Sequence, residues 1–188
     1  MNKKQFAIIG NPISHSLSPV LHNYWFEKYN IDANYILLDI EEKDIEIVVK
    51  KVRKKELNGI NVTLPYKQKI IPFVDQLVND AKSTNSVNTI YLNDDGIIGE
   101  NTDVFGLQAG YLKEINNSKN KKALVIGAGG VSPSVIFSLQ KSKIETIVEP
   151  NRKLFLNPNA KLRLKVPGYP IVLTKVCFHL VDHVKINR

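Results

Sequence analysis

The sequence predicts an α/β fold, in which a domain with a mostly parallel sheet is followed by an incomplete second α/β domain. Short apolar runs alternate with segments of helical spacing, which is typical of parallel sheets covered by helices. A polar stretch at residues 116–122 (NNSKNKK) interrupts this alternation. Such stretches mark domain boundaries. We therefore expect the first domain at residues 1–116 and the second at residues 117–188.

Composition is that of a globular protein with a core of its own. The chain has 188 residues, of which 43% are hydrophobic and 23% charged. No apolar run approaches the roughly 18 residues of a membrane span. The apolar run within residues 1–10 is too short for a signal peptide, so we expect a cytoplasmic protein. The single Cys177 excludes an internal disulfide framework and a Cys-rich zinc site.

The net charge of +8 is concentrated at the end of the chain. Residues 151–188 hold eight Lys or Arg and one acid, whereas residues 1–150 hold 18 basic and 17 acidic residues, a net charge of +1. Charge alone is a weak indication of nucleic-acid binding when no recognised binding fold accompanies it. We therefore expect no nucleic-acid partner, and a tail from about residue 153 that differs from the rest.

Hydrophobic spacing predicts the elements of the first domain. The apolar positions of residues 41–54 recur at i, i+3, i+4 and i+7, which indicates an amphipathic helix. Asp95-Gly96 predicts a hairpin turn, because glycine reaches positive φ without strain. We expect strands at residues 6–10, 33–40, 60–64, 87–92 and 96–99, and helices at residues 20–29, 41–54, 66–74, 75–81 and 103–115.

The strand at residues 60–64 is followed at once by Pro65, which has no N–H to continue a strand. Thr63 and Lys67 are then left at the carboxyl end of the sheet, where open α/β sheets bind ligands. A hydroxyl and an ammonium there can hold a small polyol and move a proton. The alternative is a turn with a solvated lysine.

Three serines, Ser14, Ser16 and Ser18, precede Pro19 at the start of the first helix. Ser18 is the expected N-cap and Pro19 the first helical residue. Hydroxyls and backbone N–H groups at a helix N-terminus can also bind an anion. The local sequence is compatible with capping alone or with an anion site.

A strand at residues 123–126 runs into a glycine-rich turn and a helix at residues 133–141, and a strand at residues 145–149 follows. This order predicts a Rossmann-like dinucleotide-binding unit, in which the turn and the helix N-terminus hold a pyrophosphate. Arg152 follows the second strand, where arginine accommodates the 2′-phosphate of NADP. Beyond residue 153 we find a possible strand at residues 171–176 and no further βα units.

Five motifs, in this order and spacing, resemble those of shikimate dehydrogenase, and they extend over about 150 residues. They are GNPISHSLSP (residues 10–19), NVTLPYK (61–67), SVNT (86–89), NTD (101–103) and GAGG (127–130).

The resemblance implies a function and roles for individual residues. The family reduces 3-dehydroshikimate to shikimate with NADPH, a step of aromatic amino-acid biosynthesis. Ser16 and Ser18 match the pair that binds the substrate carboxylate. Thr63, Asn88 and Asp103 match the residues that contact ring hydroxyls, and Lys67 matches the catalytic lysine, paired with Asp103. The cofactor residues are Gly127, Ala128, Gly129, Gly130, Val131, Asn151 and Arg152.

The chemical properties of lysine and aspartate suit this reaction, independently of the resemblance to the family. Hydride transfer to a ketone leaves an oxygen that needs a proton, and Lys67 can donate one. Since an ordinary lysine pKa is about 10.4 and a carboxylate favours the charged form, we assign Asp103 an orienting role. His15 is a second candidate acid, which we assign instead to supporting the serine loop. No metal is needed.

The sequence departs from the family pattern in three places. Thr84-Asn85-Ser86 stands where the family usually has Ile-Gly-Ala. No hydroxyl residue follows Arg152, and Pro150 precedes this motif. The remaining strands of the cofactor sheet and the family's C-terminal helix have no counterpart. We therefore expect a chain truncated or frameshifted in its NADP-binding domain, with little or no turnover.

Other functions stay open. The chain can be a non-catalytic module that binds shikimate-like or quinate-like ligands. It can also be a related enzyme whose substrate is quinate instead of shikimate, or whose cofactor is NAD instead of NADP. A small molecule is the expected partner, in a monomer or a homodimer with no membrane attachment.

Overall fold

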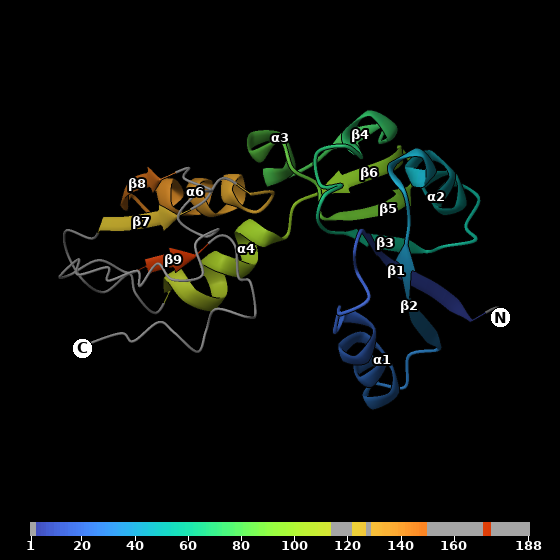
Figure 1. Ribbon diagram of the computed structural model, residues 1–188. Coiled ribbons are helices and arrows are strands. Elements are labelled where there is room, and N and C mark those ends of the chain that lie inside the picture. Colours follow the sequence, from blue (N-terminus) through green and yellow to red (C-terminus); the bar gives the residue numbers. More distant parts are fainter. Residues whose placement is uncertain (1–2, 114–121, 127–128, 150–170, 174–188) are drawn as a thin grey trace. The chain divides into compact units, whose positions relative to one another are not determined.

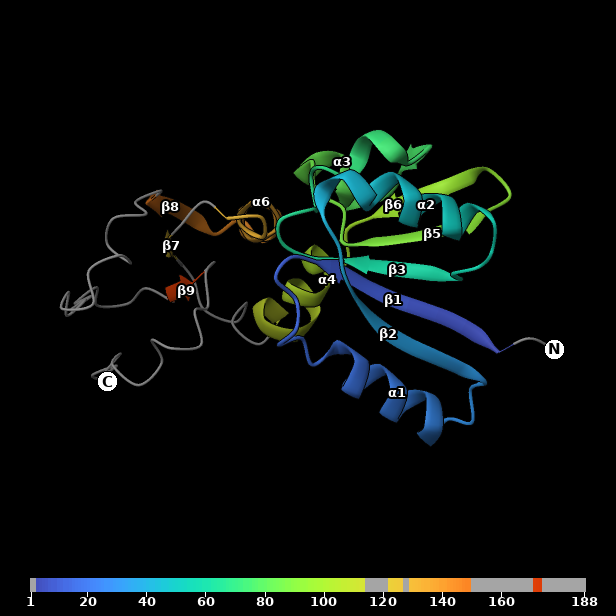
Figure 2. The same cartoon turned by 45° about the vertical axis from the view of Figure 1, so that its right-hand side comes forward.

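The computed structural model describes residues 3–113, 122–126, 129–149 and 171–173. The chain divides into two compact units, Met1–Thr102 and Asp103–Arg188, which are described separately below (Figures 1 and 2). The boundary between the two units, after Thr102, lies earlier in the sequence than the predicted boundary near residue 116. The helical segment that begins at Asp103 therefore belongs to the second unit.

The first unit is built on a six-stranded sheet with the strand order β2-β1-β3-β5-β6-β4. Strand β1 (Lys4–Gly10) lies between β2 (Ala33–Asp39) and β3 (Gly59–Val62) and is parallel to both. Helix α1 (Ser18–Lys28) connects β1 to β2. The predicted mostly parallel α/β sheet is confirmed, although β3 ends at Val62, before the expected Leu64.

The predicted amphipathic helix is confirmed, with a short 3₁₀ turn at its start. The turn is η1 (Glu42–Asp44), and α2 (Ile45–Arg53) follows. Four of the five apolar residues of α2 are buried against the sheet, namely Ile45, Val48, Val49 and Val52, whereas Ile47 is exposed. Helices α1 and α2 lie on opposite faces of the sheet (Figure 2). Adjacent β1 residues accordingly join different apolar clusters, Ile9 with α2 and Ile8 with Phe26 of α1.

The second half of this sheet contains the predicted hairpin. Strand β5 (Thr89–Asn93) is antiparallel to both β3 and β6 (Gly96–Glu100). Gly96 has a φ of 115°, the conformation for which the turn needs glycine. The Asn93 side chain accepts a hydrogen bond from the Asp95 N–H at 2.9 Å and closes the turn.

The prediction of two helices, at residues 66–74 and 75–81, is wrong in large part. The structure has a short helix η2 (Ile71–Phe73), a two-residue strand β4 (Gln76–Leu77) and a helix α3 (Asp80–Thr84). Strand β4 is parallel to β6, and backbone hydrogen bonds from Asp75 N to Ile97 O (2.8 Å) and from Val78 N to Gly99 O (3.0 Å) hold this segment to β6. Pairing with a distant strand overrides the local spacing.

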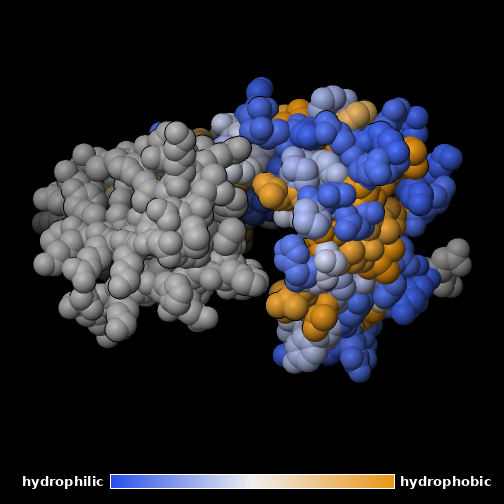
Figure 3. Space-filling model, viewed as in Figure 1, coloured by the Kyte–Doolittle hydropathy of each residue, from blue (hydrophilic) through white to orange (hydrophobic). Residues whose placement is uncertain are grey.

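Helix α1 contains no buried residue. Its exposed large hydrophobic side chains include Val20, Leu21 and Tyr24. Figure 3 shows hydrophobic surface in the region of α1 and β2.

The second unit contains a parallel β-α-β arrangement. It begins with α4 (Asp103–Leu107) and η3 (Gln108–Leu112), inside the helix expected at residues 103–115. Strand β7 (Lys122–Ile126) leads to α6 (Ser132–Lys141) and β8 (Glu145–Glu149). A short strand β9 (Ile171–Leu173) completes a parallel sheet of order β8-β7-β9. The predicted Rossmann-like unit is thus observed. The expected change at about residue 153 falls at residues 150–170, outside the described residues.

Candidate functional site

The candidate site lies at the carboxyl ends of β1, β2 and β3. Backbone hydrogen bonds join the three ends: Thr63 N donates to Ile9 O at 2.9 Å, Asn11 N donates to Leu64 O at 3.2 Å, and Ile40 N donates to Gly10 O at 3.4 Å. The loop after β1 and the segment after β3 therefore leave the same edge of the sheet. This is the edge at which α/β sheets bind ligands.

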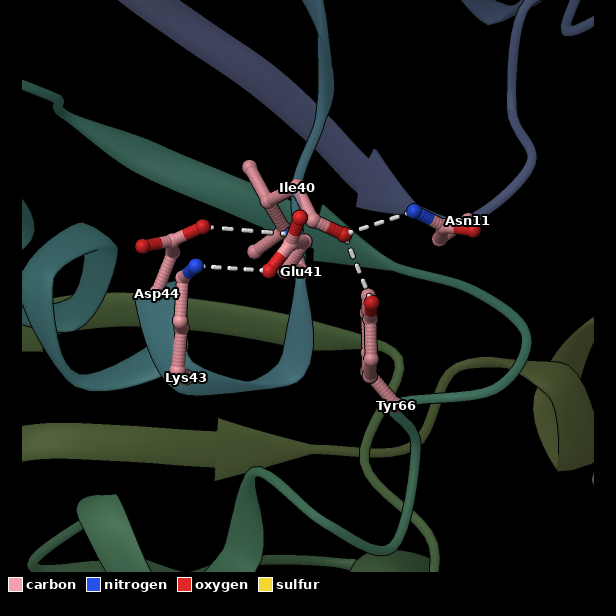
Figure 4. A network of polar contacts seen from close by, with 6 residues as sticks. All are labelled: Asn11, Ile40, Glu41, Lys43, Asp44 and Tyr66. Carbon is pink, nitrogen blue, oxygen red and sulfur yellow. Dashed lines mark hydrogen bonds and ion pairs between the residues drawn. The ribbon is translucent and has the colours of Figure 1, made fainter.

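A polar network fixes this edge (Figure 4). The Ile40 carbonyl accepts two hydrogen bonds, from Asn11 Nδ2 at 3.1 Å and from the Tyr66 hydroxyl at 2.6 Å. Burial, and to a smaller extent the charge of Glu42, raise the pKa of Tyr66, so its hydroxyl keeps the proton that it donates. One carbonyl thereby anchors the loops on either side of the candidate site.

Gly10 allows the end of β3 to approach β1 closely. A Cβ atom at this position would lie 2.7 Å from Thr63 Cγ2 and 3.0 Å from the Leu64 carbonyl oxygen. The first distance is shorter than Cβ atoms show in real structures, and the second is tighter than most real contacts and involves a backbone atom that cannot swing away. The position of the Thr63 side chain therefore depends on glycine at position 10.

The serine loop is organised differently from the prediction. Ser18 is the first residue of α1, Leu17 is the N-cap, and no side chain caps the helix. The expectation that Ser18 is the N-cap is therefore wrong. The Ser16 hydroxyl instead accepts a hydrogen bond from Ser18 N at 3.3 Å, within a turn closed by Ser16 N and Ile13 O at 2.9 Å. Ser16 and Ser18 are both half-buried at this helix start.

The structure brings Thr63, Lys67 and Asn88 together. Val62 N donates to Asn88 O at 2.8 Å, and Val87 N donates to Lys67 O at 2.8 Å. The first bond places Asn88 beside the end of β3, and the second places Lys67 beside the start of β5. All three predicted residues are half-buried, so they are held by the fold and still reach the surface.

Four further polar residues are linked to Asn88, directly or through one another, by hydrogen bonds, and none of them was among the predicted site residues. Asn88 Oδ1 accepts hydrogen bonds from Thr102 N at 2.9 Å and from Thr89 Oγ1 at 3.0 Å. Asn61 Nδ2 donates to Thr89 Oγ1 at 3.2 Å, and Asn61 Oδ1 accepts from the Tyr35 hydroxyl at 2.6 Å. One signal was available, because a polar residue such as Asn61 in a buried strand needs hydrogen-bond partners.

The remaining predicted residues fall in the second unit. Asp103 begins α4, and its pairing with Lys67 stays a prediction. Gly129, Gly130 and Val131 form the turn before α6, where Ser132 N donates to Gly129 O at 3.0 Å. The residues outside the described part of the chain are Gly127, Ala128, Asn151 and Arg152.

The turn before α6 fits the first half of a dinucleotide site. Its N-cap is Val131, whose side chain makes no capping hydrogen bond, and Pro133 occupies the first turn. The helix begins directly after a parallel strand, so its N-terminal N–H groups and positive potential lie at the carboxyl end of β7. A phosphate group suits this position.

Two features are absent from the described residues. Within residues 3–113, 122–126, 129–149 and 171–173, no three His, Cys, Asp or Glu side chains are grouped to hold a metal ion. In the same residues no helix has the length and hydrophobicity required to cross a membrane.

Comparison with known proteins agrees with this arrangement. The family model "Shikimate dehydrogenase substrate binding domain" matches residues 8–90. The chain is 50% identical over 150 residues to the shikimate dehydrogenase (NADP(+)) of Pelagibacter ubique, covering 80% of this chain and 57% of the relative. It is 39% identical to the enzyme of Staphylococcus aureus, covering 80% and 56%.

A solved structure shows the same relationship. The shikimate 5-dehydrogenase of Thermus thermophilus, in complex with NADP(H) and shikimate, superimposes with a TM-score of 0.70 at 32% identity. The match covers 77% of this chain and 55% of that protein.

The fold is that of an α/β protein with a Rossmann-like unit. Within that class, residues 8–90 match the substrate-binding domain of the shikimate dehydrogenase family, and the chain is similar to members of that family over about 150 residues. It spans about half the length of the curated relatives that it matches.

Proposed function

We propose that this chain binds shikimate and 3-dehydroshikimate in its first unit and serves the NADP-dependent reduction of 3-dehydroshikimate to shikimate. The observation that carries the proposal is the meeting of Thr63, Lys67 and Asn88 at one sheet edge through the Val62–Asn88 and Val87–Lys67 backbone hydrogen bonds. The similarity of residues 8–90 to the family's substrate-binding domain supports it. A small molecule is the partner, and the cytoplasmic location stays a prediction.

The proposed binding mode uses both loops of this edge. Ser16, Ser18 and the N-terminal N–H groups of α1 hold the substrate carboxylate, since no side chain caps this helix. Thr63, Asn88 and Asp103 are the proposed contacts of the ring hydroxyls. Because Thr63 is placed by the close approach at Gly10, its hydroxyl is oriented before the ligand arrives.

Lys67 carries the proton in this proposal. Bound NADPH supplies a hydride to the substrate ketone, and the turn before α6 would hold the cofactor pyrophosphate. Lys67 donates a proton to the carbonyl oxygen and returns to the neutral amine until it is reprotonated. Asp103 orients the ammonium group of Lys67.

Titration of the purified chain with shikimate, with and without NADP, tests the proposal by calorimetry. We expect shikimate to bind in both conditions. Absence of binding would refute the proposal. Binding of shikimate with no response to NADP and no NADPH oxidation would favour the alternative, a non-catalytic module for shikimate-like or quinate-like ligands.

Replacement of Lys67 separates catalysis from binding. Lys67→Ala should lower whatever rate of NADPH oxidation the wild-type chain supports by about 10²- to 10⁴-fold, the usual contribution of a general acid, while shikimate affinity changes only a few-fold. Lys69→Ala is the matched control, because this nearby lysine is ion-paired with Glu42 on the surface. Equal effects of the two substitutions would contradict the role given to Lys67.

A further inference from the structure

A continuous chain of side-chain hydrogen bonds crosses three strands of the first unit and ends at Asn88. The Tyr35 hydroxyl on β2 lies 2.6 Å from Asn61 Oδ1 on β3. Asn61 Nδ2 lies 3.2 Å from Thr89 Oγ1 on β5, which lies 3.0 Å from Asn88 Oδ1. Only Asn88, at the end of this chain, belongs to the residues matched to the family's ligand contacts.

The donor-to-acceptor direction of this hydrogen-bond chain is fixed at Asn61. Its Nδ2 atom lies 3.3 Å from the backbone carbonyl of Asn88, a group that can only accept a hydrogen bond. The amide nitrogen of Asn61 must face that carbonyl, and its oxygen must face Tyr35. The Tyr35 hydroxyl is therefore the donor to Asn61 Oδ1, and Asn61 Nδ2 is the donor to Thr89.

The direction is fixed again at Asn88. The backbone N–H of Thr102 can only donate, and it lies 2.9 Å from Asn88 Oδ1. The Thr89 hydroxyl accepts from Asn61 and so has its own proton to donate to the same oxygen. Asn88 Oδ1 thus accepts from two independent donors, and Asn88 Nδ2 donates to Thr102 Oγ1 at 2.9 Å, so the amide is held in one orientation.

We propose that Tyr35, Asn61 and Thr89 are positioning residues that hold the Asn88 amide in one orientation, with its Oδ1 atom toward Thr89 and the Thr102 N–H and its Nδ2 atom toward the Thr102 hydroxyl. The inference rests on the proposed shikimate site and adds to it the residues that orient one of its ligand contacts.

Tyr35, the first residue of this hydrogen-bond chain, is protected from water and from changes in pH. Tyr35 is 4% exposed, and its ring stacks on the His22 imidazole with centroids 4.3 Å apart and planes inclined by 7°. Burial raises the pKa of Tyr35, so the hydroxyl stays protonated and remains a donor. The orientation of the Asn88 amide should accordingly be the same throughout the neutral range.

The mobility of the Asn88 side chain tests the proposal in the full chain without ligand. We expect an Nδ2 order parameter at the level of ordered backbone, about 0.85, by ¹⁵N relaxation. Thr89→Val, which keeps the shape of the residue, should lower it below about 0.6, as in flexible groups. Tyr91→Phe is the control, because it removes from the same strand a hydroxyl that bonds Glu100. An unchanged order parameter in Thr89→Val would overturn the proposal.

A double-mutant cycle with shikimate tests whether these residues act through Asn88. Thr89→Val and Tyr35→Phe should each weaken binding about fivefold in the wild-type background, the effect of one hydrogen bond. Neither should weaken it further in an Asn88→Ala background. Effects that persist there would overturn the positioning role, since Tyr35 or Thr89 would then act on the ligand or the fold directly. If the wild-type chain binds no shikimate, the proposed function fails, whereas the order parameters still decide the positioning role.

Discussion

Asn85 and Ser86 occupy positions where the family usually has Gly and Ala. Asn85 fits its surroundings in this structure, whereas Ser86 does not. Asn85 has a φ of 47°, in the left-handed region, at the end of α3. Asparagine tolerates this conformation better than other side chains, so it is a reasonable substitute for glycine at a helix end. Ser86, by contrast, is completely buried, and within the described residues its hydroxyl has no hydrogen-bond partner.

Ser86→Ala should therefore raise the free energy of unfolding by about 1 kcal/mol, because it removes a buried hydroxyl without a partner. Thr84→Val is the matched control. The Thr84 hydroxyl donates to Asp80 O at 2.7 Å and accepts from Asn101 Nδ2 at 2.9 Å, so this change should cost about 1 kcal/mol. Urea denaturation measures both. A loss of stability in Ser86→Ala would mean that its hydroxyl is engaged after all.

Asp75 makes stability depend on pH. Its carboxylate accepts a hydrogen bond from Ile97 N at 2.6 Å and pairs with Arg53 at 2.9 Å. The hydrogen bond from the Ile97 backbone, followed by Arg53, lowers the pKa of Asp75 in the folded state.

A lowered folded pKa contributes stability above the unfolded value near 3.9, and this stability is lost as the pH falls through the folded pKa. Asp75→Asn should remove this contribution, so its free energy of unfolding should decline less steeply than that of the wild type below about pH 4. Denaturation at a series of pH values gives both slopes. Parallel slopes would exclude Asp75 as the titrating group.

At the scale of elements, the β5–β6 hairpin combines a local signal with a tertiary contact. The Asp95-Gly96 turn was readable from the sequence, and Gly96 indeed has a positive φ. A Cβ atom on Gly96 would also collide with the Asp75 carboxylate from the neighbouring β4 segment. The turn therefore needs glycine for two reasons, only one of which is local.

Gly96→Ala should lower the free energy of unfolding by about 1–3 kcal/mol, the cost of forcing a side chain into such a backbone conformation. Gly106→Ala is the comparison, since Gly106 lies in α4 with open space around the added methyl group. There alanine should gain about 0.5–1 kcal/mol from its helix propensity. Thermal unfolding followed by circular dichroism distinguishes the two signs; a stable Gly96→Ala would show that the hairpin can rearrange.

At the scale of the whole molecule, the two compact units divide the proposed chemistry between them. Thr63, Lys67 and Asn88 belong to the first unit, whereas Asp103 and the turn before α6 belong to the second. A ligand held mainly by the first unit should stabilise that unit most.

Hydrogen exchange of the full chain with saturating shikimate should accordingly show slower exchange at residues 10–18, 61–67 and 86–102. Little change is expected at residues 122–126 and 129–149. Exchange slows because bound ligand must dissociate before the segment opens. NADP alone should instead protect the turn before α6. Protection by shikimate confined to the second unit would contradict the assignment of its site.

The sequence by itself determined the features that depend on neighbouring residues. The spacing of Ile45, Val48, Val49 and Val52 defines α2, and the order of strand, glycine turn and helix defines the β7-α6-β8 unit. Lys67 and Thr63 could be placed at a sheet edge because Pro65 ends the strand. These signals lie within a few residues of the structure that they specify.

Only the tertiary structure decided the features that join distant parts of the chain. Strand β4 exists because residues 75–78 bond to β6, and local spacing predicted a helix there. The Tyr35–Asn61–Thr89–Asn88 hydrogen-bond chain joins three strands whose residues are up to 54 positions apart. Hydrogen bonds depend on distance and direction in space, which the order of residues does not state. The physical basis of the Asn88 orientation therefore appeared only when β2, β3 and β5 were seen in one sheet.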